Sequence, residues 1–257
     1  MLLTTDVGNT DTVLGIWEDK RLLSVSRFQT KPDRKKNEWR DILIKCQNDI
    51  KIRYAQDKER KFTEFIYGSV VPSVDNVLEE AVKSLKFQKI KRIDSKIKLP
   101  FRHKDIEISK LGADRIANMA AGVSLYSENI IIADFGTAIT FCLILNKEYK
   151  GGVIAPSLRV SLNGLISHTA KLPFVKPEKL IEIPGKTTEQ SLQMGLQIGW
   201  RGLVKEIIFE LKKRASKDTI CVATGGISEN LDYLYENFDV IDKNLTLRGL
   251  MLLYSNN

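Results

Sequence analysis

Hydrophobic and polar residues alternate along the chain in two similar arrangements. Short apolar runs at 2–5 and 130–133 each lead into an aspartate and a glycine, and further apolar runs follow at 13–17 and 141–145. Each arrangement then reaches a polar turn, "EDKR" or "NKEYKGG". Apolar runs of this length, separated by Gly, Asn and Asp, are typical of β-hairpins. The pattern therefore predicts two strand–turn–strand units about half a chain apart.

The two turns also match residue by residue. A shift of 128 positions (134 − 6) aligns them without a gap. The matched pairs are Asp6 and Asp134, Gly8 and Gly136, Asn9 and Thr137, and Thr12 and Thr140. A shift close to half the chain length indicates a duplicated domain.

The rest of the chain alternates between helical and extended patterns. We expect helices at 37–54, 74–85, 113–127 and 188–214, and extended segments at 64–71, 86–94 and 151–158. The stretch 218–238 predicts a strand, a Gly-rich turn and a helix. Ser73 is the expected start of the second helix, and Thr187 with Gln190 has the spacing of a capping box before the last. Alternation of this kind predicts an α/β fold.

Composition narrows the classes of protein. The chain has 257 residues, 43% hydrophobic, and no apolar run near the roughly 20 residues of a membrane-spanning helix. The start "MLLTTDVGNT" lacks the basic region of a secretory signal. Three widely spaced cysteines predict reduced thiols in a cytosol. The net charge of +8 is spread among acidic residues without a nucleic-acid-binding motif, so we expect no nucleic-acid partner and a surface that favours anionic small substrates.

Each hairpin turn combines a carboxylate with groups that bind phosphate. Gly8 and Gly136 allow backbone N–H groups to approach an anion closely. Asn9, Thr10 and Thr137 add side-chain donors. An aspartate repels phosphate, so it acts beside a polyphosphate only through a cation or an ordered water.

Asp6 and Asp134 are therefore candidate ligands of a cation or water near a polyphosphate. The alternative is structural, because an aspartate here can cap its own turn through the backbone. One copy alone favours that alternative, whereas two copies in equivalent hairpins favour the ligand role. A third signal at 221–228, "CVATGGIS", places Thr-Gly-Gly where a base or ribose can lie close to the backbone.

Together, these three motifs resemble the superfamily of acetate and sugar kinases, actin and heat-shock ATPases. The resemblance extends in order over nearly the whole chain. It implies an α/β fold of duplicated ribonuclease-H-like domains, as in actin-like ATPases, with a nucleotide cleft between them. We expect these domains at 1–115 and 116–257.

Further motifs narrow the resemblance to one family. "DVGNT", "GADRIAN", "DFGTAIT", "GGVIAP", "HTAKLP", "GKTTEQSLQMG" and "ATGG" occur in an order similar to that of type III pantothenate kinases. These enzymes phosphorylate pantothenate with ATP in the first step of coenzyme A biosynthesis. The resemblance implies a cytoplasmic kinase with ATP and pantothenate as substrates, and a homodimer whose subunits share the active site.

The resemblance also implies roles for individual residues. Asp114 is the implied catalytic base, Asp134 the ligand of a monovalent cation (K⁺ or NH₄⁺), and Asp6 a candidate Mg²⁺ ligand. Thr188 is implied to reach pantothenate from the neighbouring subunit, with Thr187 as the alternative assignment. The implied ATP-binding residues are Asp6, Val7, Gly8, Asn9, Thr10, Asp11, Thr12, Val13 and Thr137. The implied substrate-binding residues are Gly112, Ala113, Asp114, Arg115 and Thr188.

Some features depart from the family or stay open. Asp11 adds a negative charge beside the first turn, and Ser157 stands where the family usually has glycine. The connection before Gly112 is divergent, with Phe101 or His103 as candidates to line the pantothenate site. Taken singly, an aspartate at a helix start is as often a cap as a catalytic group.

Two other functions remain alternatives on the sequence. One is a different small-molecule kinase of the same superfamily, and the other is a nucleotide-binding regulator without phosphoryl transfer. A regulator does not need Asp114, so this residue discriminates between them. The glycines at 195, 199 and 202 permit close helix packing, either inside the chain or across a dimer.

Overall fold

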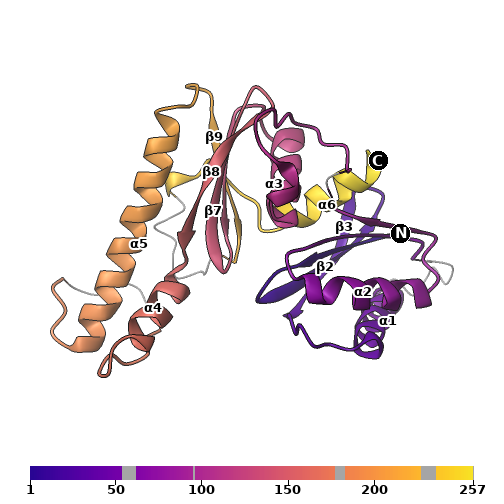
Figure 1. The fold of residues 1–257 in the computed structure, drawn as a ribbon, viewed down its shortest axis with the longest axis horizontal. Helices are drawn as coiled ribbons and strands as arrows, with labels where there is room; N and C mark the ends of the chain where they lie inside the picture. Colours follow the sequence, from indigo (N-terminus) through magenta and orange to yellow (C-terminus); the bar gives the residue numbers. More distant parts are fainter. Residues whose placement is uncertain (54–61, 95, 177–182, 227–235, 257) are drawn as a thin grey trace. The chain divides into compact units, whose positions relative to one another are not determined.

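The computed structural model describes residues 1–53, 62–94, 96–176, 183–226 and 236–256. The chain forms two compact units, and Figure 1 traces their elements. The first unit comprises Met1–Pro100, Glu107–Ala121 and Leu245–Asn257, and the second comprises Phe101–Ile106 and Gly122–Asn244. Both units are therefore assembled from separated stretches of sequence. The division expected at 115/116 lies inside a helix, Ala113–Leu125.

The first unit contains a five-stranded sheet in the order β3-β2-β1-β4-β5. Strand β1 pairs antiparallel with β2 and parallel with β4. The strands are β1 (Leu2–Val7), β2 (Asp11–Glu18), β3 (Arg21–Gln29), β4 (Glu64–Ser69) and β5 (Lys89–Arg92). The helices assigned wholly or mainly to this unit are α1 (Lys36–Arg53), α2 (Pro72–Ser84), α3 (Ala113–Leu125) and α6 (Leu245–Ser255), with a short 3₁₀ helix at Ile108–Lys110.

Apolar side chains of this sheet pack against α1 and α2. Leu3, Leu14 and Phe65 form one buried cluster with Trp39 of α1 and Leu78 of α2. Burying such a side chain contributes about 1.5–3 kcal/mol. Helix α6 packs on β1, β2 and β4 although it comes last in the sequence.

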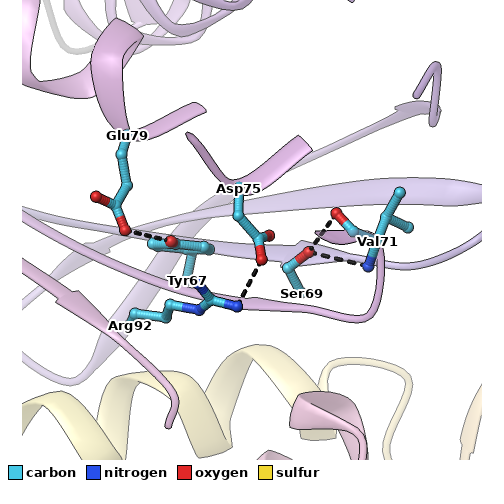
Figure 2. Close-up of polar contacts among 6 residues, drawn as sticks. All are labelled: Tyr67, Ser69, Val71, Asp75, Glu79 and Arg92. Atoms are coloured by element: carbon cyan, nitrogen blue, oxygen red, sulfur yellow. Dashed lines mark hydrogen bonds and ion pairs between the residues drawn. The ribbon is translucent and has the colours of Figure 1, made fainter. Parts of the chain in front are cut away.

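Two polar pairs fasten α2 to the sheet, as Figure 2 shows. The Tyr67 hydroxyl donates to Glu79 Oε1 at 2.6 Å, and Arg92 Nη2 donates to Asp75 Oδ2 at 2.5 Å. The Tyr67 bond holds the pKa of Glu79 below its usual value, while burial raises the pKa of Tyr67. Asp75 is buried, so the Arg92 partner offsets the cost of burying its charge.

The second unit repeats this sheet in the order β10-β9-β6-β7-β8. Its core joins the sheet residues Phe135 and Phe141 to Trp200 and Val204 of α5. The strands are β6 (Ile130–Phe135), β7 (Ala138–Leu145), β8 (Glu148–Pro156), β9 (Ile220–Gly225) and β10 (Val240–Ile241). The helices are α4 (Leu158–Ser167) and α5 (Thr188–Lys212).

The predicted duplication is confirmed in detail. The sequence of buried and half-buried residues is identical in β1 and β6, in β2 and β7, and in β4 and β9. The pairing of β2 with β3 shifts register after Ile16, and the pairing of β7 with β8 shifts register at the equivalent position, after Leu143. The two units therefore share strand order, pairing direction and irregularities.

One part of the predicted alignment is wrong. Asp6 pairs with Val13, a separation of 7 (13 − 6), whereas Asp134 pairs with Thr140, a separation of 6 (140 − 134). The second turn is thus one residue shorter. Beyond the turn, Thr12 corresponds to Ile139 rather than to Thr140.

The other predicted elements lie close to their expected positions, but the sequence pattern did not predict β3, α4 or α6, and two predicted details differ. Helix α2 begins at Pro72, and its N-cap is Val71 without a side-chain hydrogen bond, so Ser73 is not the cap. Proline fits this position because its missing N–H has no helical partner there. The helix expected after the Thr-Gly-Gly turn falls largely at 227–235, outside the described residues. In the parts of the chain that are described, no helix is long and apolar enough to cross a membrane.

Candidate active site

The first candidate turn connects β1 to β2. The Gly8 N–H donates to the Asp11 carbonyl at 3.0 Å and closes the turn. A Cβ at Gly8 would lie 2.9 Å from that carbonyl oxygen, so the turn requires glycine. Asn9 is exposed at the tip, and Asp6 is half-buried at the end of β1. The turn thus presents donors outward beside a carboxylate.

Not every residue of the implied ATP-binding segment faces outward. Val7 and Thr12 are buried, and the Thr12 hydroxyl pairs with that of Thr30. Asp11 instead forms an exposed ion pair with Arg27 at 3.2 Å. The extra negative charge beside the turn therefore has a cationic partner.

The second candidate turn connects β6 to β7. The Gly136 N–H donates to the Ala138 carbonyl at 3.1 Å, and both Gly136 and Thr137 are exposed. Asp134 is half-buried at the strand end and lies between Thr140 of β7 and Thr224 of β9 in the register of the sheet. Paired residues on neighbouring strands point to the same face, so a row of oxygen-bearing side chains crosses this end of the sheet.

Thr224 adds an unusual feature to this row. It is 1% exposed, and its hydroxyl has no hydrogen-bond partner among the described residues. A buried hydroxyl without a partner is costly, and a bound cation is one way to satisfy it.

Gly225 explains part of the Thr-Gly-Gly signal. Its φ is +89°, and a Cβ there would lie 2.5 Å from Asp134 Oδ1. The next residue, Gly226, donates its N–H to the Phe135 carbonyl at 3.0 Å. Gly225 therefore allows the Asp134 carboxylate to lie against the backbone of β9.

Asp114 occupies the first turn of α3, inside the helix rather than at its N-cap. Its Oδ1 accepts from the Arg115 N–H at 2.8 Å. A Cβ at Gly112 would clash with that same oxygen and would lie 3.3 Å from Val70. Burial raises the pKa of Asp114, and the hydrogen bond from Arg115 and its charge oppose that rise. Gly112 and Arg115 thus fix a carboxylate whose pKa is shifted toward neutrality.

Thr187 and Thr188 have different surroundings at the start of α5. The Thr187 hydroxyl accepts from the Gln190 N–H at 3.2 Å, and Gln190 Oε1 accepts from the Lys186 N–H at 2.9 Å. The predicted cap at Thr187 is confirmed. Thr188 is the exposed first residue of the helix. The cap occupies Thr187, which favours Thr188 as the residue that meets a ligand.

The structure shows the surroundings of the residues that depart from the family pattern or that the sequence left open. Ser157 caps α4, because its hydroxyl accepts from the Val160 N–H at 3.3 Å. Phe101 is buried and His103 Nδ1 lies 3.2 Å from the Ile106 carbonyl, both within the second unit. Cβ atoms at the three α5 glycines would meet nothing within 4 Å in the described structure. Packing among the described residues therefore does not account for these glycines.

Sequence reasoning missed Thr30 and Arg34, because nothing in their local sequence marks them as neighbours of the first turn. It singled out Thr224 only within the Thr-Gly-Gly turn, as a surface for a base or ribose, and not as the neighbour of Asp134 in the sheet. Across the described ranges, no three His, Cys, Asp or Glu side chains gather to hold a metal. A cation carried by phosphates and water needs fewer protein ligands than that. The arrangement suits binding of a nucleotide and removal of a proton by a positioned carboxylate.

The repeated sheet and the paired turns define an actin-like ATPase or sugar-kinase fold. A solved protein described as a Baf family transcriptional activator, from Campylobacter jejuni, is 23% identical, with a TM-score of 0.56 over 99% of this chain and 98% of its own. MreB5 of Spiroplasma citri bound to ADP is 9% identical, with a TM-score of 0.51 over 99% and 96%. At these identities, the likeness concerns the fold alone.

Within that class, the chain belongs to the type III pantothenate kinase family. The sequence model of this family matches residues 2–210. A curated type III pantothenate kinase of Bacillus cytotoxicus is 35% identical over 260 aligned positions, covering 100% of this chain and 97% of the relative. The family expected from the motifs is thus confirmed.

Proposed function

We propose that this chain transfers the γ-phosphoryl group of ATP to the primary hydroxyl of pantothenate. The products are ADP and 4'-phosphopantothenate, in the first step of coenzyme A biosynthesis. The observation that carries the proposal is the full-length match to a type III pantothenate kinase. Asp114 supports the proposed reaction, because it is a carboxylate with a raised pKa at the start of a helix and could act as the base.

Asp114 is the proposed general base. The pantothenate hydroxyl must lose its proton as its oxygen attacks phosphorus, and a positioned carboxylate accepts it. Burial raises the pKa of Asp114, which makes its carboxylate a stronger base and favours proton transfer. Arg115 and the backbone of Gly112 and Ala113 are proposed to bind pantothenate beside it. The permanent charge of Arg115 suits the substrate carboxylate.

The first turn and Thr137 are proposed to bind ATP. Within residues 6–13, the Gly8 N–H closes the turn, and the tip of the turn is proposed to offer backbone N–H groups and the side chains of Asn9 and Thr10 to phosphate oxygens. Asp6 is proposed to hold the Mg²⁺ that accompanies ATP, directly or through water. When bound, the ion neutralises charge on the transferring phosphoryl group.

Asp134 is the proposed ligand of a monovalent cation, K⁺ or NH₄⁺. The residues around it fit such an ion, because Thr140 and the partnerless hydroxyl of Thr224 are its neighbours in the sheet. Oxygen ligands of this type suit a hard cation.

A homodimer with a shared active site is proposed for the assembly. Thr188 would then reach pantothenate in the neighbouring subunit. Exposed apolar side chains on β8, α4 and α5 support an interface there: Ile154, Val160, Leu165 and Ile198. The three α5 glycines also face open space in the described structure. All three cysteines are buried free thiols, which agrees with a proposed cytoplasmic location.

The test is an ADP-release assay with purified full-length chain, MgATP and K⁺, with and without pantothenate. We expect ADP release that depends on pantothenate. Asp114→Asn should lower kcat by about 10²–10⁴ while leaving ATP affinity unchanged. Turnover on sugars or other carboxylates but not on pantothenate would instead support another kinase of the superfamily. ATP binding without turnover on any acceptor would support a regulator.

A stability measurement separates lost chemistry from lost folding in Asp114→Asn. Because folding raises the Asp114 pKa, the ionised carboxylate destabilises the fold at pH values above that pKa. The variant removes this charge, and its amide oxygen can still accept from the Arg115 N–H. Its melting midpoint at pH 8 should equal or exceed that of the wild type. The difference should shrink as the pH falls through the folded-state pKa.

A further inference from the structure

Thr30, the residue after β3, braces the first turn from outside the hairpin. Its N–H donates to the Thr10 carbonyl at 2.8 Å, and its hydroxyl pairs with the Thr12 hydroxyl at 2.8 Å. Thr12 is fully buried and Thr30 is 6% exposed, so water does not compete for the hydroxyl pair. One residue thus holds both neighbours of Asp11.

The segment that carries Thr30 is itself firmly held. Arg34 Nη2 donates to the Gln29 carbonyl at 3.0 Å, and Gln29 is the register partner of Asp11. The Arg34 guanidinium also lies 4.9 Å from the ring centroid of Phe28 and 4.8 Å from that of Trp39. Stacking on two rings immobilises this side chain. The brace is therefore anchored in the core of the first unit.

In the part of the chain that the structure describes, the second hairpin has no counterpart of the hydroxyl pair. Ile139 occupies the place of Thr12, and Ser157 occupies the place of Thr30. The Ser157 hydroxyl caps α4 instead. The fold of the hairpin does not require the hydroxyl pair, so the pair serves the longer first turn in particular.

We propose that Thr30 is a positioning residue for ATP, acting through Thr10 and Thr12. Phosphate binding requires several N–H groups of one short turn to converge on the same anion. A turn that is already ordered does not lose conformational freedom when the nucleotide binds. The inference rests on the proposed function only in so far as the chain binds ATP at this turn.

The test compares MgATP affinity in Thr30→Val and in the wild type by titration calorimetry. Valine keeps the shape and the N–H bond to Thr10 but removes the hydroxyl pair. We expect the Kd for MgATP to rise about fivefold, the size of one net hydrogen bond. In the ADP-release assay, the KM for ATP should rise in parallel while kcat and the KM for pantothenate stay within about twofold. Thr30→Ser should restore the wild-type affinity.

Thr4→Val is the matched control. Thr4 is fully buried in the same hairpin, where its hydroxyl donates to the Gly15 carbonyl at 3.2 Å and accepts from Trp17 Nε1 at 2.9 Å. It lies away from the turn, so this variant should lower the melting midpoint but leave the Kd for MgATP unchanged.

The outcomes separate the two proposals. An unchanged Kd in Thr30→Val, or an equal loss of affinity in Thr4→Val, would overturn the positioning role. The calorimetric result stands even if pantothenate proves not to be the acceptor, because it does not involve pantothenate. A wild-type chain without measurable MgATP affinity would overturn both proposals.

Discussion

The two hairpin turns share one ancestral design but are stabilised in different ways. The first turn is one residue longer and is held from outside by Thr30. The second is shorter, and its carboxylate, Asp134, lies against Gly225 on the neighbouring strand. In the first unit the position of Gly225 is taken by Ser69, whose hydroxyl bonds to the Val71 backbone (Figure 2).

This difference shows how a duplicated element diverges in function. In the first turn the Gly8 N–H closes the loop, and Asn9 and Thr10 are the proposed phosphate donors. The second turn instead has the hydroxyl-bearing residues Thr140 and Thr224 beside one carboxylate, Asp134. The shared strand order positions both turns, while the side chains that contact each turn from outside differ.

The largest effect on stability expected in this comparison comes from adding a side chain at Gly225, next to Asp134. Gly225→Ala puts a side chain on a residue with φ of +89° and pushes against Asp134 Oδ1. We expect the free energy of unfolding to fall by about 2–3 kcal/mol. With the carboxylate displaced, kcat/KM should fall by at least about tenfold. Chemical denaturation and the ADP-release assay measure the two effects.

Ser69→Ala is the matched change in the first unit. It removes only the two partly buried hydrogen bonds of one hydroxyl with the Val71 backbone, each worth about 0.5–1.5 kcal/mol. Its kcat/KM should stay near the wild-type value. If both variants lose activity equally, the special relation between Gly225 and Asp134 is wrong.

The next effect concerns the proposed cation. Asp134→Asn should remove the stimulation by K⁺ relative to Na⁺ and lower kcat/KM by about one to two orders of magnitude in saturating K⁺. Removing the Thr224 hydroxyl, in Thr224→Val, should weaken the apparent K⁺ affinity with a smaller loss at saturation. Activity is measured over a K⁺ titration, and the melting midpoint supplies an independent readout of K⁺ binding. Full K⁺ stimulation in Asp134→Asn would exclude the ligand role.

The sequence sufficed for features determined by local patterns. The two hairpins, the α5 cap and the α3 helix that carries Asp114 all depend on residues a few positions apart. The last helix is different. Gly249 of α6 packs against the backbone of Ala117 in α3, so close that a Cβ would clash. No local signal indicates that these two helices meet.

The same limit applies to the candidate site. The aspartate–glycine turns were visible because their chemistry is contiguous. The length difference between the turns was not, because it appears only in the strand register. Thr30 and Thr12 are 18 positions apart, and Asp134 and Gly225 lie on strands joined by a long connection. Pairings of this kind follow from tertiary packing.

The smallest expected effect concerns the charge that only the first turn carries. Asp11 is paired with Arg27, whereas its counterpart in the second turn is the uncharged Ala138. The two side chains are 40% and 50% exposed, so the pair contributes at most about 1 kcal/mol to stability. The two single variants of this pair, Arg27→Gln and Asp11→Asn, should affect the KM for ATP differently. Arg27→Gln leaves an unneutralised carboxylate beside the proposed phosphate site and should raise the KM for ATP about two- to threefold at low salt.

Asp11→Asn removes that carboxylate as well and should leave the KM for ATP equal to or slightly below the wild-type value. The double variant should behave like Asp11→Asn, because Arg27 has no charge left to neutralise. Raising the ionic strength should diminish the effect of Arg27→Gln, since both side chains are exposed to screening. An increase of the KM for ATP in Asp11→Asn would mean that this carboxylate helps to bind the nucleotide, for example through its cation, and that Asp11 contributes a ligand rather than only a charge that Arg27 neutralises.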